Sequence, residues 1–292
     1  MSIRLSLSIA LTCCLVLPPA HAQDRAAWNA PQKPFRIFGN TYYVGPHGLS
    51  SILVKTSQGL VLIDGDLPES TPLIEANIRE LGFRISDVRW ILNSHAHSDH
   101  AGGIAELQRA SGAQVLASAA GAHAMELGGA DPNDPQYGTA PTYPPVHHVR
   151  VVADGETLHL GDVDITAHYT PGHTPGSTSW TWRTCEGGTC LNIAYADSLT
   201  AISNPHYRFT DAAAHPHRVE DFRRAIATVA ALPCDILLTP HPGASDFWER
   251  MKRREAGTQP DPLVDQNACK AYAATAEKDL DARLDKERAS QP

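Results

Sequence analysis

Three histidines and one aspartate fall within six positions of this 292-residue chain, in the stretch Asn93-Ser94-His95-Ala96-His97-Ser98-Asp99-His100-Ala101-Gly102-Gly103. In an extended segment alternate side chains point the same way, so His95 and His97 can reach one metal ion. Asp99 and His100 continue into a turn, which directs them to a second point, and the two glycines allow the backbone to turn there. Imidazole is a preferred ligand of zinc. The pattern therefore predicts the main ligand cluster of a two-metal site.

Two further histidines lie far from this cluster in the sequence. His173 follows a predicted strand in Thr170-Pro171-Gly172-His173-Thr174-Pro175-Gly176-Ser177, and His241 follows another in Pro240-His241-Pro242-Gly243. Each alone would be interpreted as an ordinary loop histidine. Beside an incomplete ligand cluster both become candidate ligands, which the fold must bring together. The remaining histidines are interpreted as surface or core residues, and they include His47, His123, His147, His148, His206, His215 and His217.

The elements that must position these residues alternate between strands and helices. Short β-branched and apolar runs predict strands over 35–44 (with a turn at Gly39-Asn40), 51–56, 59–63, 88–92, 115–116, 148–152, 157–160, 163–169, 177–183, 191–196 and 236–238. Apolar residues at helical spacing predict helices from Thr71, as a capping hydroxyl, to Gly82, and over 104–110, 118–127, 219–229 and 268–288. Residues 23–34 are expected to form an extended arm and 128–145 a long loop. This order predicts an α/β fold of two similar halves, with two sheets face to face and helices outside.

Residues 1–22 have the features of a cleavable export signal. Arg4 precedes an apolar stretch from Leu5 to Leu17, and Ala20-His21-Ala22 fits the cleavage rule before Gln23. The stretch is too short for a membrane span. Acylation at Cys13 or Cys14 is a weaker alternative, since neither follows the small residue that such processing prefers. The mature chain, residues 23–292, is expected to form one domain in the periplasm. The formal charge of −8 argues against nucleic-acid binding.

Four cysteines remain after the signal: Cys185, Cys190, Cys234 and Cys269. An even number in an exported chain indicates disulfides, and four cysteines allow three pairings. Cys185-Glu-Gly-Gly-Thr-Cys190 looks like a hairpin tip, where a bridge is sterically easy, and this leaves Cys234 with Cys269. A cysteine zinc site is the weaker alternative, because the second pair is not closely spaced.

The whole pattern resembles a known family. His-x-His-x-Asp-His, with Gly-His and Pro-His at later strand ends, is similar to the metallo-β-lactamase superfamily over about Phe35 to Lys286, and implies a four-layer αββα sandwich. The third subclass of class B β-lactamases matches best. The strings that resemble it are Ser94 to Gly103, Asp134-Pro135-Gln136, Pro171-Gly172-His173-Thr174, Ser179-Trp180-Thr181-Trp182, Tyr195 to Thr200, and Cys234-Asp235-Ile236-Leu237.

The resemblance implies two zinc ions (Zn²⁺) with a bridging hydroxide that attacks the β-lactam carbonyl. Asp99 would also orient this hydroxide. No serine nucleophile is needed. The implied ligands are His95, His97 and His173 for the first zinc, and Asp99, His100 and His241 for the second.

Two neighbouring residues, Asp197 and Ser198, divide the possible activities. Neighbours at a strand end point opposite ways, so only one can face the metals. An inward Asp197 would resemble ester and phosphoester hydrolases, in which an aspartate bridges both metals. The match from Ala196 to Thr200 favours Ser198 instead, with Thr200 on the same face and Asp197 making structural hydrogen bonds. The resemblance then implies that Ser198, Thr200 and Gln136 bind the substrate carboxylate. Strand-end capping is the alternative for the two hydroxyls.

The leading hypothesis is a monomeric, exported zinc β-lactamase acting on penicillins, cephalosporins and carbapenems, which would confer antibiotic resistance. The alternative is another hydrolase of the superfamily, acting on a lactone, thioester or phosphoester. An exported metal-binding protein without activity is disfavoured, because structural zinc sites are closed and rich in cysteine, whereas these ligands are histidine and aspartate on loops.

Overall fold

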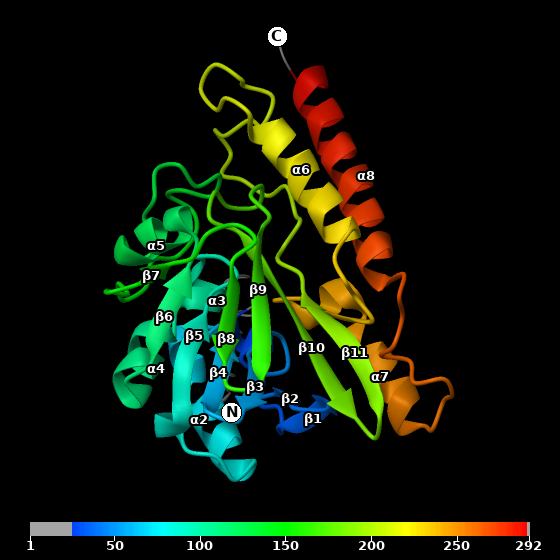
Figure 1. Ribbon diagram of the computed structural model, residues 1–292. Coiled ribbons are helices and arrows are strands. Elements are labelled where there is room, and N and C mark those ends of the chain that lie inside the picture. The colour runs from blue at the N-terminus through cyan, green and yellow to red at the C-terminus, as the bar shows by residue number, and fades with distance from the viewer. Residues whose placement is uncertain (1–24, 291–292) are drawn as a thin grey trace, which may run out of the picture.

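Two β-sheets stack face to face in the computed structural model, which describes residues 25–290 (Figure 1). The predicted signal, with Cys13 and Cys14, lies outside the described residues. A core of large apolar side chains, including Tyr43 and Trp180, fills the space between the sheets. Two further apolar clusters lie under the helices on the outer faces. The predicted α/β sandwich is therefore confirmed.

The first sheet has seven strands and carries the histidine cluster at the carboxyl end of its fifth strand. Its strands pair antiparallel up to β4 and parallel from β4 onwards. The order is β1 (Phe35–Phe38), β2 (Thr41–Tyr43), β3 (Ile52–Thr56), β4 (Gly59–Ile63), β5 (Val88–Leu92), β6 (Gln114–Ala117) and β7 (Arg150–Val151). The cluster follows β5, whose carboxyl end lies between β4 and β6.

The second sheet has five strands, and the loops at its strand ends carry His173, Ser198 and His241. Its order is β12 (Ile236–Leu238), β11 (Thr189–Tyr195), β10 (Thr178–Glu186), β9 (Val163–Tyr169) and β8 (Thr157–Leu160). Each sheet thus supplies part of the candidate site from one edge of the sandwich.

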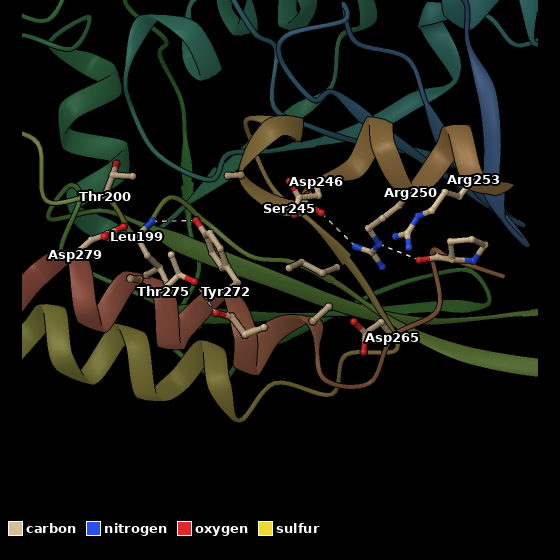
Figure 2. Close-up of a pocket in the computed structure, with 16 residues that line it drawn as sticks. Leu199, Thr200, Ser245, Asp246, Arg250, Arg253, Asp265, Tyr272, Thr275 and Asp279 are labelled. Atoms are coloured by element: carbon tan, nitrogen blue, oxygen red, sulfur yellow. Dashed lines mark hydrogen bonds between the residues drawn. The ribbon is translucent and has the colours of Figure 1, made fainter. Parts of the chain in front are cut away.

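Helices cover the outer face of each sheet. The apolar cluster on the first sheet includes residues of α2 (Thr71–Glu80), α4 (Ile104–Ser111) and α5 (Ala119–Glu126). The second sheet is covered by α6 (Arg218–Ala230) and α8 (Ala268–Ala289), which run side by side in Figure 1. A cavity of about 560 Å³ lies between α8 and α7 (Phe247–Glu255) (Figure 2). The short helices are η1 (Pro68–Ser70), η2 (Ile85–Asp87), α3 (Ser98–Ala101) and η3 (Pro242–Ser245). Within residues 25–290, no helix is both long and apolar enough to cross a membrane.

The structure corrects several predicted elements. The N-terminal arm is not extended throughout, because residues 25–28 form a helical turn. Thr71 is the first residue of α2 rather than its cap, and no side chain caps this helix. The strand predicted over 148–152 shortens to Arg150–Val151. Helix α7 was not predicted, since its sequence FWERMKRRE offers only Phe247 and Met251 as buried apolar residues.

Both favoured disulfides are present, which excludes a zinc site at these four cysteines. Cys185–Cys190 closes the β10–β11 hairpin, where the two residues face each other in the ladder. Cys234–Cys269 joins the segment before β12 to the first turn of α8 across a sequence separation of 35.

Removal of the longer disulfide is expected to destabilise the fold more than removal of the shorter one. A cross-link restricts the unfolded chain more when it closes a longer loop, so we expect losses of about 4 kcal/mol for Cys234→Ser with Cys269→Ser and about 2 kcal/mol for Cys185→Ser with Cys190→Ser. Urea unfolding of both double variants gives the two values. A larger loss for the hairpin pair would contradict this expectation.

Candidate metal centre

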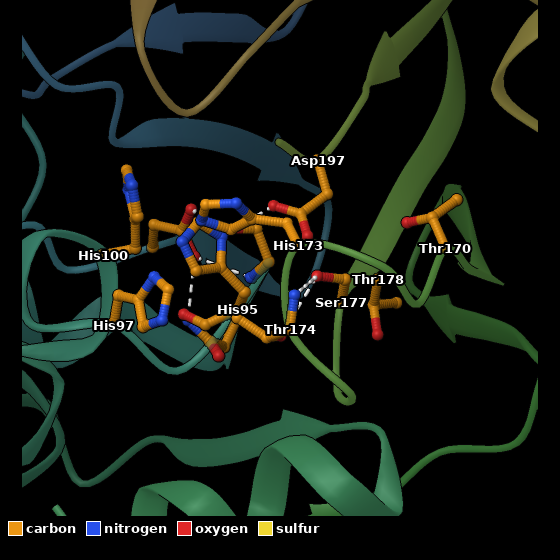
Figure 3. A network of polar contacts seen from close by, with 12 residues as sticks. His95, His97, His100, Thr170, His173, Thr174, Ser177, Thr178 and Asp197 are labelled. Atoms are coloured by element: carbon orange, nitrogen blue, oxygen red, sulfur yellow. Dashed lines mark hydrogen bonds and ion pairs between the residues drawn. The ribbon is translucent and has the colours of Figure 1, made fainter. Parts of the chain in front are cut away.

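His95, His97 and His173 form the first ligand cluster (Figure 3). His95 and His97 come from the loop after β5, and His173 from the loop between β9 and β10. All three are buried, and one ring nitrogen of each lies within 4.8 Å of the others. The structure therefore brings together three histidines from the strand ends of two sheets, as predicted.

The other ring nitrogen of each histidine has its own partner. His95 Nδ1 lies 2.7 Å from Asp197 Oδ1, and His97 Nε2 lies 3.0 Å from Asp134 Oδ2. His173 Nδ1 lies 2.8 Å from the Thr200 carbonyl oxygen. Such contacts fix the tautomer and orientation of a metal-binding imidazole. They leave His95 Nε2, His97 Nδ1 and His173 Nε2 for a metal ion.

Asp99, His100 and His241 form the second ligand cluster. Asp99 Oδ2 lies 3.3 Å from His100 Nε2 and 3.2 Å from His241 Nε2, and the two histidine nitrogens are 3.2 Å apart. Tetrahedral bonds of about 2.0–2.1 Å to zinc place ligand atoms about 3.3 Å apart. Ligand atoms of Asp99 and His100 also lie within 4.8 Å of one of His95. The two clusters are thus adjacent, and their donor sets fit two zinc ions.

The backbone that carries the first ligands is held by the buried carboxylate of Asp64. This carboxylate accepts hydrogen bonds from the Ser94 N–H at 2.7 Å, the Ser94 hydroxyl at 2.6 Å and the Asn93 amide at 3.1 Å. The Tyr195 hydroxyl, from the second sheet, donates a fourth at 2.8 Å. Asp64 also has a positive φ of 62°, a conformation that aspartate tolerates better than most residues. Asp64 therefore connects the turn after β4, the ligand loop and β11.

The protonation of the histidines suits metal binding in the first cluster. Burial lowers the pKa of His95 well below its usual value, and burial with the neighbouring histidines lowers the pKa of His173 to about 3. Both rings are neutral at pH 7, the form that binds metals. In the second cluster burial disfavours charge, but the carboxylates of Asp99, Asp64 and Asp66 together outweigh it and raise the pKa of His100 to about 9. A metal ion there would displace that proton, so metal and proton compete for His100.

Comparison with known proteins agrees with this geometry. The family model described as "Metallo-beta-lactamase superfamily" matches residues 44–185. The structure of Rm3 metallo-β-lactamase is 52% identical, covers 93% of this chain and 100% of its own, and superposes with a TM-score of 0.88. This chain belongs to the metallo-β-lactamase superfamily.

Two further solved metallo-β-lactamases are similar over most of their length. MEM-A1, a subclass B3 enzyme from a soil metagenome library, is 50% identical, with 90% of this chain and 100% of its own covered and a TM-score of 0.87. MIM-1 from Novosphingobium pentaromativorans is 47% identical, with 92% and 95% covered and a TM-score of 0.85. The predicted resemblance to the third subclass of class B is confirmed at the level of these neighbours.

Curated relatives with other activities match a shorter part of the chain. The hydroxyacylglutathione hydrolase of Rhodobacter capsulatus is 32% identical over 119 residues, which is 39% of this chain and 36% of that protein. The chain thus spans about a third of the length of the curated relatives it matches. Their likeness supports the superfamily and a hydrolase, but does not distinguish substrates.

The predicted substrate-binding residues lie near the first ligand cluster. Ser198 is buried next to Asp197, and Thr200 is exposed with its Oγ1 3.1 Å from His173 Nδ1. Gln136 donates its backbone N–H to Asp134 Oδ1 at 2.7 Å, so it lies beside the partner of His97. Their role in binding a substrate stays a prediction.

Two residues with roles at the site were not assigned from the sequence, and the partner of a third was not foreseen. Asp197 was expected to make structural hydrogen bonds, and the structure shows one with the ring of His95. Asp134 supports His97 from the long loop, where Asp-Pro-Gln was recognised as a family string without a role for the aspartate. Asp64 follows directly after β4, a position where a strand-end aspartate could have been suspected.

Loss of the Asp134 carboxylate is expected to weaken zinc binding at the first cluster. Replacing a residue that orients a metal ligand typically lowers metal affinity or activity 10–100-fold, so we expect about a 30-fold loss of zinc affinity for Asp134→Ala. Asp134→Asn keeps an acceptor for His97 and should lose less. A chelator competition titration measures both.

Asn133→Ala is the control for this prediction, because Asn133 is an exposed residue of the same loop. Its zinc affinity should match that of the wild type. An unchanged affinity in Asp134→Ala would show that His97 is oriented without this carboxylate.

Proposed function

We propose that this protein is an exported, monomeric β-lactamase that uses two zinc ions to hydrolyse the amide bond of penicillins, cephalosporins and carbapenems. After removal of the signal, the protein would be located in the periplasm, where it meets β-lactams before they reach cell-wall enzymes. Full-length similarity to several solved metallo-β-lactamases at 47–52% identity supports this proposal.

The observation that carries the choice of substrate is the position of Asp197. Its carboxylate oxygen Oδ1 lies 2.7 Å from His95 Nδ1, the ring nitrogen that does not face the first cluster. In an ester or phosphoester hydrolase, an aspartate at this position would bridge both metals, and its carboxylate would lie between the two ligand clusters. With Asp197 Oδ1 engaged by His95 Nδ1, we assign the contact with the substrate to Ser198, the next residue of this strand end.

Each group of the site has a chemical task in this proposal. Two zinc ions, when bound, would activate a water molecule near neutral pH and polarise the amide carbonyl. Asp99 accepts a hydrogen bond from the attacking water and orients it. Ser198, Thr200 and Gln136 bind the carboxylate that β-lactams carry next to the ring nitrogen. Asp134 and Asp197 hold His97 and His95 in position.

Hydrolysis of another substrate is the second candidate. It is suggested by curated relatives that are hydroxyacylglutathione hydrolases, although this chain matches only about a third of their length. Export would separate the protein from glutathione thioesters, which are cytosolic. The two candidates differ in substrate while sharing the metal centre, so a metal-loaded protein can be tested on both.

The deciding experiment is a steady-state rate panel with the purified mature chain. It contains a penicillin, a cephalosporin, a carbapenem and a hydroxyacylglutathione thioester, each with and without a chelator. We expect β-lactam turnover that the chelator abolishes and added zinc restores. No β-lactam turnover at two zinc ions per chain would reject the proposal, and thioester turnover alone would favour the second candidate.

Export and association state have their own measurements. Cell fractionation is expected to place the processed chain, starting at Gln23, in the periplasmic fraction. Light scattering of the purified chain is expected to give the mass of a monomer. A full-length chain in the cytosolic fraction, or a dimer mass, would contradict the corresponding part of the proposal.

A further inference from the structure

The segment after β11 carries two residues of the site but has little regular structure of its own. Asp197 supports His95, and Ser198 follows it, in a stretch of 196–204 without helix or strand. Its position must therefore be fixed by contacts to other elements. Helix α8 supplies several of these contacts, beside others from β10, β12 and the loop of His173.

Helix α8 contacts this segment and its continuation at three points along its length. Near its start, Tyr272 bonds to the backbone at 197 and 199. About three turns further on, Arg283 donates to Ser203 Oγ at 2.7 Å. Near its end, the Glu287 carboxylate accepts the N–H groups of Phe209 at 3.2 Å and Thr210 at 2.9 Å. The helix thus holds the chain from 197 to 210 as a continuous support.

Tyr272 is the contact nearest to the metal ligands. Its hydroxyl accepts the Leu199 N–H at 3.1 Å (Figure 2). The same hydroxyl donates to the Asp197 carbonyl oxygen at 3.1 Å. One hydroxyl therefore joins the backbone on both sides of Ser198. A buried N–H and C=O that lose such a partner are each costly, so the bridge favours one conformation of residues 197–199.

The Tyr272 hydroxyl acts beside other contacts of this segment, since the Asp197 N–H donates to Ser179 Oγ at 3.0 Å and Leu199 is buried. Tyr272, Leu199 and Thr200 line the cavity of about 560 Å³ between α8 and α7. Side chains that border a cavity lack packing partners on that side and restrain their neighbours less. The start of α8 is in turn fixed by the Cys234–Cys269 disulfide, one turn before Tyr272.

We propose that Tyr272 is a positioning residue that sets the place of Ser198, and with it the affinity for the substrate, from outside the metal centre. It touches neither the metal ligands' side chains nor the substrate. Its effect passes through the backbone of residues 197–199. The part of this inference that concerns substrate rests on the proposed β-lactamase function, whereas the backbone effect does not.

The first test measures the backbone directly by hydrogen–deuterium exchange of the peptide that contains Leu199. Tyr272→Phe keeps the ring and removes the hydroxyl, and one hydrogen bond has a net value that corresponds to about a five-fold change in a local equilibrium. We expect about five-fold faster exchange of this peptide in Tyr272→Phe. Thr275→Ala is the matched control, since it lines the same cavity and its hydroxyl bonds only to Ala271 O of its own helix. Equal exchange in Tyr272→Phe, Thr275→Ala and wild type would overturn the inference.

The second test is kinetic and uses a double-mutant cycle. For a β-lactam we expect Tyr272→Phe to raise KM about five-fold and to leave kcat within two-fold, because it displaces a substrate contact. In a Ser198→Ala background the same substitution should leave KM unchanged, since the contact it positions is gone. An equal rise of KM in both backgrounds would overturn the proposed route through Ser198. If the wild type does not hydrolyse β-lactams, the proposed function fails, and the exchange measurement alone decides the role of Tyr272.

Discussion

Asp99→Asn is expected to lower kcat/KM for β-lactams about a thousand-fold and to reduce bound zinc from two ions per chain to one. A metal ion contributes several kcal/mol to a hydrolytic transition state, and a thousand-fold loss corresponds to about 4 kcal/mol. Asp99 is the only carboxylate among the six candidate ligands, and its oxygen lies 3.2–3.3 Å from the nitrogens of His241 and His100. Burial disfavours its charge, but the two histidines outweigh this and hold the pKa of Asp99 well below its usual value.

The measurement combines metal analysis with steady-state kinetics at saturating zinc. Glu106→Gln is the matched control, because it removes an exposed carboxylate of the neighbouring helix α4 that pairs with Arg109. This control should keep two zinc ions and full activity. Full activity of Asp99→Asn would show that neither metal binding nor orientation of the water depends on this carboxylate.

The residues that could be predicted from the sequence are those whose information is local. His95, His97, Asp99 and His100 lie in one short stretch, so their common site follows from spacing alone. The strands were recognised because apolar and β-branched runs form the buried ladders of both sheets. The hairpin disulfide Cys185–Cys190 is likewise local.

The features that were missed depend on residues brought together by tertiary structure. The partner of His97 is 37 positions away, and that of His95 is 102 positions away. No spacing rule relates such pairs, since loop conformation decides them. Helix α7 shows the same limit, because its short and mostly polar sequence contacts the core at Phe247 and Met251, which only the tertiary structure reveals.

Asp64→Ala is expected to destabilise the metal-free protein by about 5 kcal/mol, even though Asp64 contacts no metal position. The side chain is fully buried and accepts four hydrogen bonds, from Asn93, Tyr195 and twice from Ser94. Each buried donor that loses its acceptor costs about 1–3 kcal/mol. Urea unfolding, compared with wild type, measures the loss.

Asp64→Asn separates the contribution of the hydrogen bonds to stability from that of the side-chain volume. Its amide oxygen can still accept from the Asn93 amide and the Ser94 N–H, while its NH₂ group faces the two hydroxyls of Ser94 and Tyr195. A hydroxyl can turn and accept, whereas a backbone N–H cannot. We therefore expect Asp64→Asn to lose about half as much stability as Asp64→Ala. Equal losses in the two variants would mean that shape, not the acceptors, holds the ligand loop. The expected difference would instead show that one buried carboxylate fixes the loop of His95 and His97 before any metal binds.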